Sequence, residues 1–177
     1  MELHLDDLQQ LFNSMDPAPF VRRDLDPKAS DYIVDWAEET PKGQPLAMLV
    51  QLNQSTPGDE ALLGDAVRDY YKRRAVAKRR ELSQLFKVGR ISLLIGLACL
   101  GGAVIVGEAL APLFTKDSHG YVFKESLIIG GWVALWRPIE IFLYDWWPIR
   151  AKARLFDRLG AMHVALRVGA TPARGVA

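Results

Sequence analysis

The sequence predicts a membrane α-helical hairpin, formed by two transmembrane helices, with a small α/β cytoplasmic N-terminal module. Two long apolar runs occupy the second half of the 177-residue chain. Charge is also uneven: residues 1–66 hold thirteen Asp and Glu against four Lys and Arg, whereas residues 68–90 hold nine Lys and Arg against two acids. An acidic head, a basic neck and apolar spans are therefore expected in that order.

Residues 1–57 are predicted to form the acidic α/β head. A first short helix is expected from apolar residues at helical spacing between Leu5 and Met15, ended by Asp16-Pro17. Asp26 followed by Pro27 is a helix start, and the apolar stripe behind it consists of Ala29, Tyr32, Ile33, Trp36 and Ala37. Alternating apolar residues predict a strand over 46–52, and a second strand is expected over 20–23.

Residues 58–90 are predicted to form a basic helical neck. Its first turns carry apolar residues at core-facing spacing: Leu62, Leu63, Ala66, Val67, Tyr70 and Tyr71. The basic residues expected to contact anionic lipid are Lys72, Arg73, Arg74, Lys78, Arg79, Arg80, Lys87 and Arg90. Such charge could also bind nucleic acid, but the run adjoins an apolar span, where each cation near anionic lipid contributes roughly 1 kcal/mol. We therefore expect lipid and no nucleic acid as the partner.

Residues 91–114 are predicted to be the first transmembrane helix. Glu108 is the only charge in this run, and a helix of this length would extend about 36 Å, enough to cross a bilayer. No other part of the chain is large enough to bury so apolar a helix. Residues 115–121 are predicted to form a short external loop.

Residues 122–147 are predicted to be the second transmembrane helix, with a kink near Pro138. Arg137 and Glu140 interrupt this run, and charge inside a bilayer is costly. Two placements fit: Arg137 near mid-bilayer and paired with Glu140, or Arg137 at the cytoplasmic boundary with Pro138 bending the chain along the interface. The aromatic residues expected to anchor the interface are Trp136, Tyr144, Trp146 and Trp147.

Residues 148–168 are predicted to be a cytoplasmic amphipathic helix, and residues 169–177 a disordered tail. Arg150, Lys152 and Arg154 follow the second span and are also expected to contact anionic lipid, and the neck cations precede the first span. Positive flanks stay inside, so both termini are expected in the cytoplasm. The start of the chain also lacks the pattern of a signal peptide.

Small residues recur at four-residue spacing on both spans. They are Cys99, Ala103 and Gly107 on the first, and Ser126, Gly130 and Ala134 on the second. Such rows let helix backbones approach closely, which predicts packing within the hairpin or self-association into a homo-oligomer or a larger membrane complex.

The sequence offers no catalytic residue, metal site or cofactor motif. Asp24 and Asp26 form an Asp-x-Asp that in some transferases holds a metal, but Asp26 is already expected to cap a helix. The lone Cys99 allows no intrachain disulfide, and His4, His119 and His163 are scattered. Arg137, Glu140 and Glu108 could belong to an ion pathway, yet two spans cannot enclose one alone. A structural ion pair is the favoured interpretation.

The segment from Gly131 to Pro148, GWVALWRPIEIFLYDWWP, resembles a family of small uncharacterised bacterial integral membrane proteins. The head pattern MDPAPF at residues 15–20, followed by Arg23-Asp24-Leu25-Asp26 and Tyr32-Ile33, is similar to theirs as well. The resemblance implies a protein of the bacterial inner membrane and implies no activity. From the residues we expect a non-enzymatic assembly, scaffold or accessory subunit; the alternatives are a subunit of an oligomeric channel or transporter and, more distantly, a metal-dependent transferase.

Overall fold

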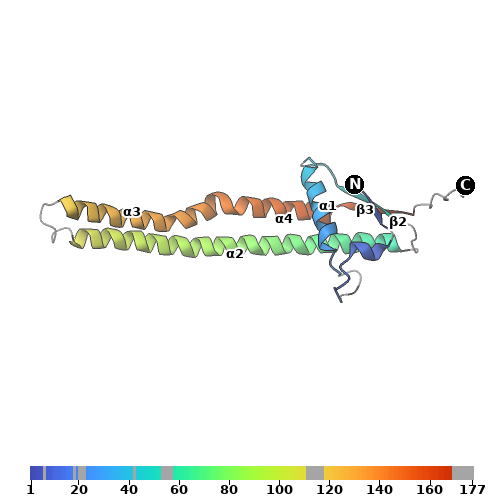
Figure 1. Cartoon of the computed structure of the whole chain (residues 1–177), viewed down its shortest axis with the longest axis horizontal. Coiled ribbons are helices and arrows are strands. Elements are labelled where there is room, and N and C mark those ends of the chain that lie inside the picture. Colours follow the sequence, from blue (N-terminus) through green and yellow to red (C-terminus); the bar gives the residue numbers. More distant parts are fainter. Residues whose placement is uncertain are drawn as a thin grey trace, which may run out of the picture. The chain divides into compact units, whose positions relative to one another are not determined.

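The computed structural model describes residues 1–5, 7–17, 19, 23–41, 43–52, 58–110 and 118–168. The chain is mostly helical with one small sheet (Figure 1). It divides into two compact units. We call Met1–Lys78 with Ala151–Ala177 the head unit, and Arg79–Arg150 the helical unit.

The head unit contains a three-stranded parallel sheet. Strands β1 (Glu2–Leu5) and β3 (His163–Val168) flank the central strand β2 (Ala47–Leu52). Leu3 pairs with Val50, and Val50 pairs with Leu166, so both ends of the described chain enter one sheet. The predicted strand over 46–52 is confirmed, whereas the strand expected over 20–23 lies largely outside the described residues.

The predicted helix over 148–168 is wrong in its second half. Helix α4 (Trp146–Gly160) ends at Gly160, and the chain then forms β3. Val164 and Leu166 alternate with Ala165 and Arg167, which is the period of a strand. Leu166 also lies at helical spacing from Leu155, Leu159 and Met162, and this spacing is what predicts a helix here.

The predicted N-terminal helix is also wrong. Glu2–Leu5 is β1, and only Leu8–Leu11 is helical, as the 3-10 helix η1. A strand fits because Leu3 and Leu5 alternate with Glu2 and His4. Leu11 and Phe12 are buried, but Met15 is 88% exposed and belongs to no core.

Helix α1 (Pro27–Glu39) forms as its sequence predicts. The Asp26 side chain accepts hydrogen bonds from the backbone N–H groups of Lys28 and Ala29, and Pro27 occupies the first turn. Ile33 and Ala37 face the core, whereas Tyr32 is exposed and does not.

The head core is not confined to residues 1–57, because it also includes residues from the start of α2 and from the last part of the described chain. Tyr71 of α2 (Asp59–Leu110) is fully buried, and Phe156, Leu159 and Val164 join the same cluster. The predicted boundary at residue 57 is therefore wrong, since the head unit needs the first turns of the neck and residues after the second apolar run. Leu62 is the exception among the neck residues expected in the core, at 45% exposed.

The helical unit is built from the rest of α2, from α3 (Ser118–Glu140), from the π-helix η4 (Ile141–Asp145) and from the start of α4. Neck and first span are one unbroken helix. Helices in Glu60–Leu110 and Tyr121–Gly160 are long and apolar enough to cross a membrane. The connector after Leu110, to residue 117, lies outside the described residues, as does the tail from residue 169.

Glycines form the close contacts between α2 and α3. A Cβ added at Gly96 would lie 2.7 Å from Leu135 Cδ2, and one at Gly131 would lie 2.9 Å from the Leu100 Cα. Farther along, a Cβ at Gly89 would lie 2.8 Å from Ile141 Cγ2. Residue numbers fall on one helix as they rise on the other, so the two helices run antiparallel.

Candidate functional site

A charge cluster lies where α3 passes into η4. The guanidinium of Arg137 donates to Glu140 Oε2 at 3.2 Å and pairs with Asp145 Oδ2 at 3.0 Å. The indole N–H of Trp136 donates to the other oxygen of Glu140 at 2.9 Å. The expected pair of Arg137 and Glu140 is present, and the second carboxylate on Arg137 was not predicted.

Backbone geometry explains how Asp145 reaches Arg137. In a regular α-helix, eight residues rotate about 80° beyond two full turns, which would move Asp145 off the face of Arg137. The π-helix Ile141–Asp145 closes i→i+5 bonds and rotates less per residue, so it returns Asp145 toward that face. Pro138 lies inside α3 directly before this turn and has no N–H to give the helix. Where the sequence predicts a kink near Pro138, the structure has a π-helical turn that begins three residues later.

The geometry of the cluster suits stabilisation of the helix junction better than catalysis. Arg137 remains 61% exposed in its side chain and Glu140 40%. One cation faces two carboxylates, and a single indole donor completes the group. Such an arrangement can fix the helix junction, and its remaining exposure leaves room for contact with lipid headgroups, water or another subunit.

Aromatic residues surround the junction. Trp136, Tyr144 and Trp147 are 66%, 70% and 64% exposed, as interfacial anchors would be. Trp146 is half-buried, because its indole N–H donates to the carbonyl of Phe142 at 2.9 Å and its ring meets Phe86.

Glu108 is neutralised by a residue that sequence reasoning missed. Lys124 Nζ lies 3.2 Å from Glu108 Oε1, and this ion pair joins α2 to α3. Gly107 allows the contact, since a Cβ there would lie 3.2 Å from Lys124 Cγ. Glu108 and the Arg137 cluster are separate: each has partners of its own.

Only some of the predicted small residues lie at the contact between the two apolar helices. Gly107 is buried against Lys124, and the Ala134 carbonyl faces Gly96. Ala103 is half-buried, whereas Cys99, Ser126 and Gly130 are exposed, and nothing lies within 4 Å of a Cβ on Gly130. The small residues of α2 that contact the second helix are Gly89, Gly96 and Gly107, and the first two are seven residues apart, which is the heptad spacing of packed helices.

The basic residues expected at lipid divide into three groups. Arg73 and Arg74 are engaged within the head unit, with Arg74 5.5 Å from both the Tyr70 and Phe156 rings. Lys78 is half-buried. The remaining members have exposed side chains: Lys72, Arg79, Arg80, Lys87, Arg90, Arg150, Lys152 and Arg154.

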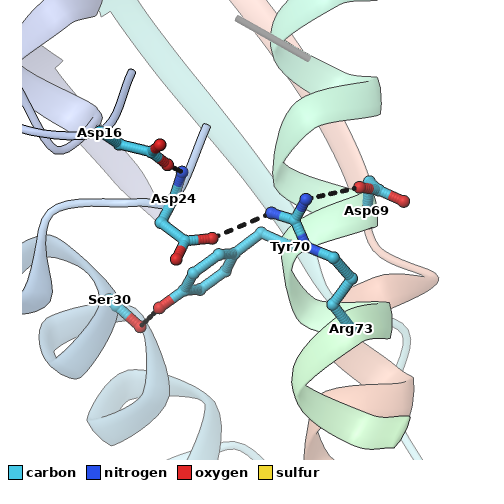
Figure 2. Close-up of polar contacts among 6 residues, drawn as sticks. All are labelled: Asp16, Asp24, Ser30, Asp69, Tyr70 and Arg73. Carbon is cyan, nitrogen blue, oxygen red and sulfur yellow. Dashed lines mark hydrogen bonds and ion pairs between the residues drawn. The ribbon is translucent and has the colours of Figure 1, made fainter. Parts of the chain in front are cut away.

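The carboxylates of the Asp-x-Asp serve the fold of the head unit. Arg73 lies between Asp24 Oδ1 at 3.0 Å and Asp69 Oδ2 at 3.2 Å (Figure 2). The backbone N–H of Asp24 donates to Asp16 Oδ2 at 2.7 Å, and Asp26 caps α1. In the described part of the chain, no three His, Cys, Asp or Glu side chains converge as a metal site would require.

A buried hydroxyl joins α1 to α2 beside this cluster. Ser30 is fully buried and accepts hydrogen bonds from the Tyr70 hydroxyl and from Arg74, each at 3.1 Å (Figure 2 shows the first). The adjacent Tyr71 is also fully buried, and burial raises the pKa of its phenol above the ordinary value of 10.0. These contacts hold the head together and present no open nucleophile.

The chain matches no protein-family model, no curated protein and no solved structure. The resemblance to small bacterial integral membrane proteins therefore stays a prediction.

Proposed function

We propose that this chain is a non-enzymatic protein of the bacterial inner membrane, which spans the bilayer twice as a helical hairpin and acts as an assembly, scaffold or accessory subunit. The head unit lies in the cytoplasm and binds the partner. The hairpin inserts the protein and self-associates.

The parallel sheet supports the proposed two-span membrane topology. β1 precedes both apolar helices and β3 follows them, yet both pair with β2. Strands of one sheet lie on one side of a membrane, so the chain between β2 and β3 crosses an even number of times. Two candidate spans lie in that interval, and the exposed cations that flank them favour the cytoplasmic side.

The exposure of the apolar helices supports insertion. Only 11% of the most apolar window in α2, and 22% of that in the second helix, is buried within the chain. A core helix of a soluble protein would be mostly buried. Leu94, Ile105 and Val133, for example, are 68%, 69% and 67% exposed, and lipid tails are the solvent that suits them.

The open face of the sheet supports partner binding by the head unit. Parallel sheets are normally covered on both faces. Here Met48, Val50 and Val164 are buried on one face, while the other presents exposed or half-exposed side chains. That second face consists of Glu2, His4, Ala47, Leu49, Gln51, His163, Ala165 and Arg167.

Glycines that make no close contact within the chain support self-association of the hairpin. Nothing lies within 4 Å of a Cβ placed on Gly101, Gly102 or Gly130. Small residues on a lipid-facing surface let a second helix approach closely.

Extraction of the full chain in native lipid nanodiscs, followed by mass photometry, tests the assembly. We expect particles containing more than one 19.8-kDa chain or a partner, and a shift toward single chains when Gly101 and Gly102 are replaced by leucine. Ile105→Leu is the matched control, because Ile105 is exposed on the same helix and leucine has the same side-chain size as isoleucine. Single chains without a partner in the unmodified protein would contradict the proposal.

The exposure of Arg137 favours a second candidate, a subunit of an oligomeric channel or transporter. Its side chain stays 61% exposed despite two ion pairs, so neighbouring copies could bring several such clusters together. Ion flux in proteoliposomes that is lost in Arg137 or Glu140 variants of normal assembly size would support this candidate over the first.

A further inference from the structure

An open apolar groove lies on the helical unit. Its walls are Leu82 and Phe86 of α2, Phe142 of η4, and Trp146 and Arg150 of α4, and its volume is about 360 Å³. That volume falls within the range of roughly 300–1,000 Å³ typical of small-molecule sites. Four of the five side chains are apolar or aromatic, and the fifth is a cation.

The groove lies beside a point of close approach between α2 and η4. At Gly89 the two helices are so close that a Cβ would lie 2.8 Å from Ile141 Cγ2. Less than one turn away, Phe86 places a ring between them, 6.1 Å from the Phe142 ring and 6.4 Å from the Trp146 ring. The three rings line the groove next to this close contact.

The aromatic wall is held in place before any ligand arrives. The Trp146 indole donates to the Phe142 carbonyl at 2.9 Å, which fixes the orientation of the ring. Trp147 packs edge-on against it at 5.5 Å. A pre-formed wall lowers the entropy cost of binding.

Arg150 supplies a cation at one end of the wall. Its guanidinium lies 5.5 Å from the centroid of the Trp146 ring. A stacked guanidinium keeps its in-plane N–H donors available, and their geometry suits a phosphate. Within the described part of the chain, Arg150 pairs with no carboxylate.

The segment that forms the other wall is strongly basic. Residues 79–90 contain Arg79, Arg80, Lys87 and Arg90 against Glu81 alone. An occupant with an anionic group is therefore favoured over a neutral or zwitterionic one.

We infer that this groove binds one anionic phospholipid, with an acyl chain against the Phe86, Phe142 and Trp146 rings and the phosphate on Arg150. This inference rests on the proposed membrane insertion. A docked helix fits less well, since the α2 wall from Leu82 to Phe86 extends only about 6 Å along the axis, and helix docking uses anchors from i to i+7.

Photocrosslinking of the full chain in vesicles tests the site. Two samples of phosphatidylcholine vesicles are compared. One contains a trace of phosphatidylglycerol with a diazirine in its acyl chain, and the other a trace of phosphatidylcholine with the same diazirine. Labelled peptides are mapped by mass spectrometry. We expect phosphatidylglycerol to label Leu82 or Phe142 about fivefold more than phosphatidylcholine does, which is the factor for one cation near an anionic headgroup. Ile105, which is 69% exposed, reports ordinary lipid contact and should be labelled equally by both lipids.

Two variants and one control make the result specific. Arg150→Gln should reduce phosphatidylglycerol labelling in the groove to the phosphatidylcholine level, and Leu82→Trp, which fills the groove and keeps the cation, should reduce it for both lipids. Lys87→Gln removes an exposed cation that belongs to the basic segment but does not line the groove, so it should lower phosphatidylglycerol labelling less than Arg150→Gln does. Unchanged labelling at Ile105 reports that each variant is folded and inserted. If Arg150→Gln loses the labelling at Ile105, the result for Leu82→Trp alone tests the lipid site.

Three outcomes would overturn the inference. They are equal groove labelling by the two lipids, an equal loss in Lys87→Gln, and groove peptides crosslinked to a second copy of this chain instead of lipid. Release of the chain from membranes by alkaline carbonate would contradict the proposed membrane insertion itself. Retention with equal labelling overturns the lipid site alone.

Discussion

The carbonyl oxygen of Ala134 faces the α-carbon of Gly96, so closely that a Cβ on Gly96 would lie 3.0 Å from it. The helical donor for this carbonyl would be the N–H of residue 138, and that residue is Pro138, which has none. The freed carbonyl can accept a weak Cα–H···O contact from the glycine. Pro138 and Gly96, on different helices, therefore act together.

Replacing Gly96 with alanine should weaken the packing of α2 on α3. The added Cβ meets a backbone oxygen that cannot move away, and overpacking typically costs roughly 1–3 kcal/mol. Gly101→Ala is the control, because nothing lies within 4 Å of its Cβ and alanine in a helix gains roughly 0.5–1 kcal/mol over glycine. The free energy of unfolding from a detergent titration should fall for the first variant and hold or rise for the second. Equal changes in the free energy of unfolding would contradict a role for Gly96 in packing α2 on α3.

Reversing the charges of the junction cluster should separate a structural pair from a pathway. Arg137→Glu brings three carboxylates together, so folded yield should drop, and Arg137→Glu with Glu140→Arg should recover much of it. Asp145→Asn alone should cost less than the loss of Arg137, since Glu140 still pairs with the guanidinium. Folded yield and assembly size by gel filtration measure these effects. A swapped variant that folds no better than the single one would contradict the structural interpretation.

Local patterns predicted the parts of this chain that local physics determines. Asp26-Pro27 predicted the start of α1, alternation predicted β2, and hydropathy predicted the two long apolar helices. The sheet was not predictable in the same way, because β1 is four residues long and β3 is separated from β2 by more than a hundred residues. Pairing over such a distance leaves no periodic signal in either segment.

The junction shows the same limit on a smaller scale. Arg137 and Glu140 are three residues apart and their pairing follows from helix geometry. Asp145 is eight residues away and joins them only because the backbone turns as a π-helix. Nothing in the pattern of apolar residues indicates that turn.

Val164 distinguishes the strand from the amphipathic helix that the sequence suggested. Val164 is 5% exposed in β3, but it would lie off the apolar face of a helix through Leu155, Leu159, Met162 and Leu166. Val164→Asn buries an amide without a designated partner and should cost roughly 1–3 kcal/mol in addition to the lost apolar burial. Arg167→Asn, on the exposed face, is the control. Thermal unfolding of the full chain measures both, and equal midpoints would contradict the strand.

Tyr71 should make the head unit sensitive to alkali. Burial raises the pKa of its phenol above the ordinary value of 10.0, so the neutral form is favoured in the folded state. Below about pH 10 the phenol is neutral in both states and this contribution to stability is complete. As pH rises further the unfolded state loses its proton first, and stability declines. Unfolding followed stepwise above pH 9 should show a steeper decline than in Tyr71→Phe, and parallel declines would assign the effect to other groups.

Accessibility of single cysteines to an impermeant maleimide tests the two-span topology most directly. In a Cys99→Ala background, cysteines at Met15, Asp117 and Arg167 report the first part of the head, the predicted external loop and β3. Met15 and Arg167 are exposed, so their accessibility depends on the side of the membrane. In sealed vesicles of either orientation, Met15→Cys and Arg167→Cys should react together from the cytoplasmic side and Asp117→Cys from the opposite side. Labelling of the Met15 and Arg167 positions from opposite sides, or of all three from one side, would contradict a head built from both ends of a chain that crosses the membrane twice.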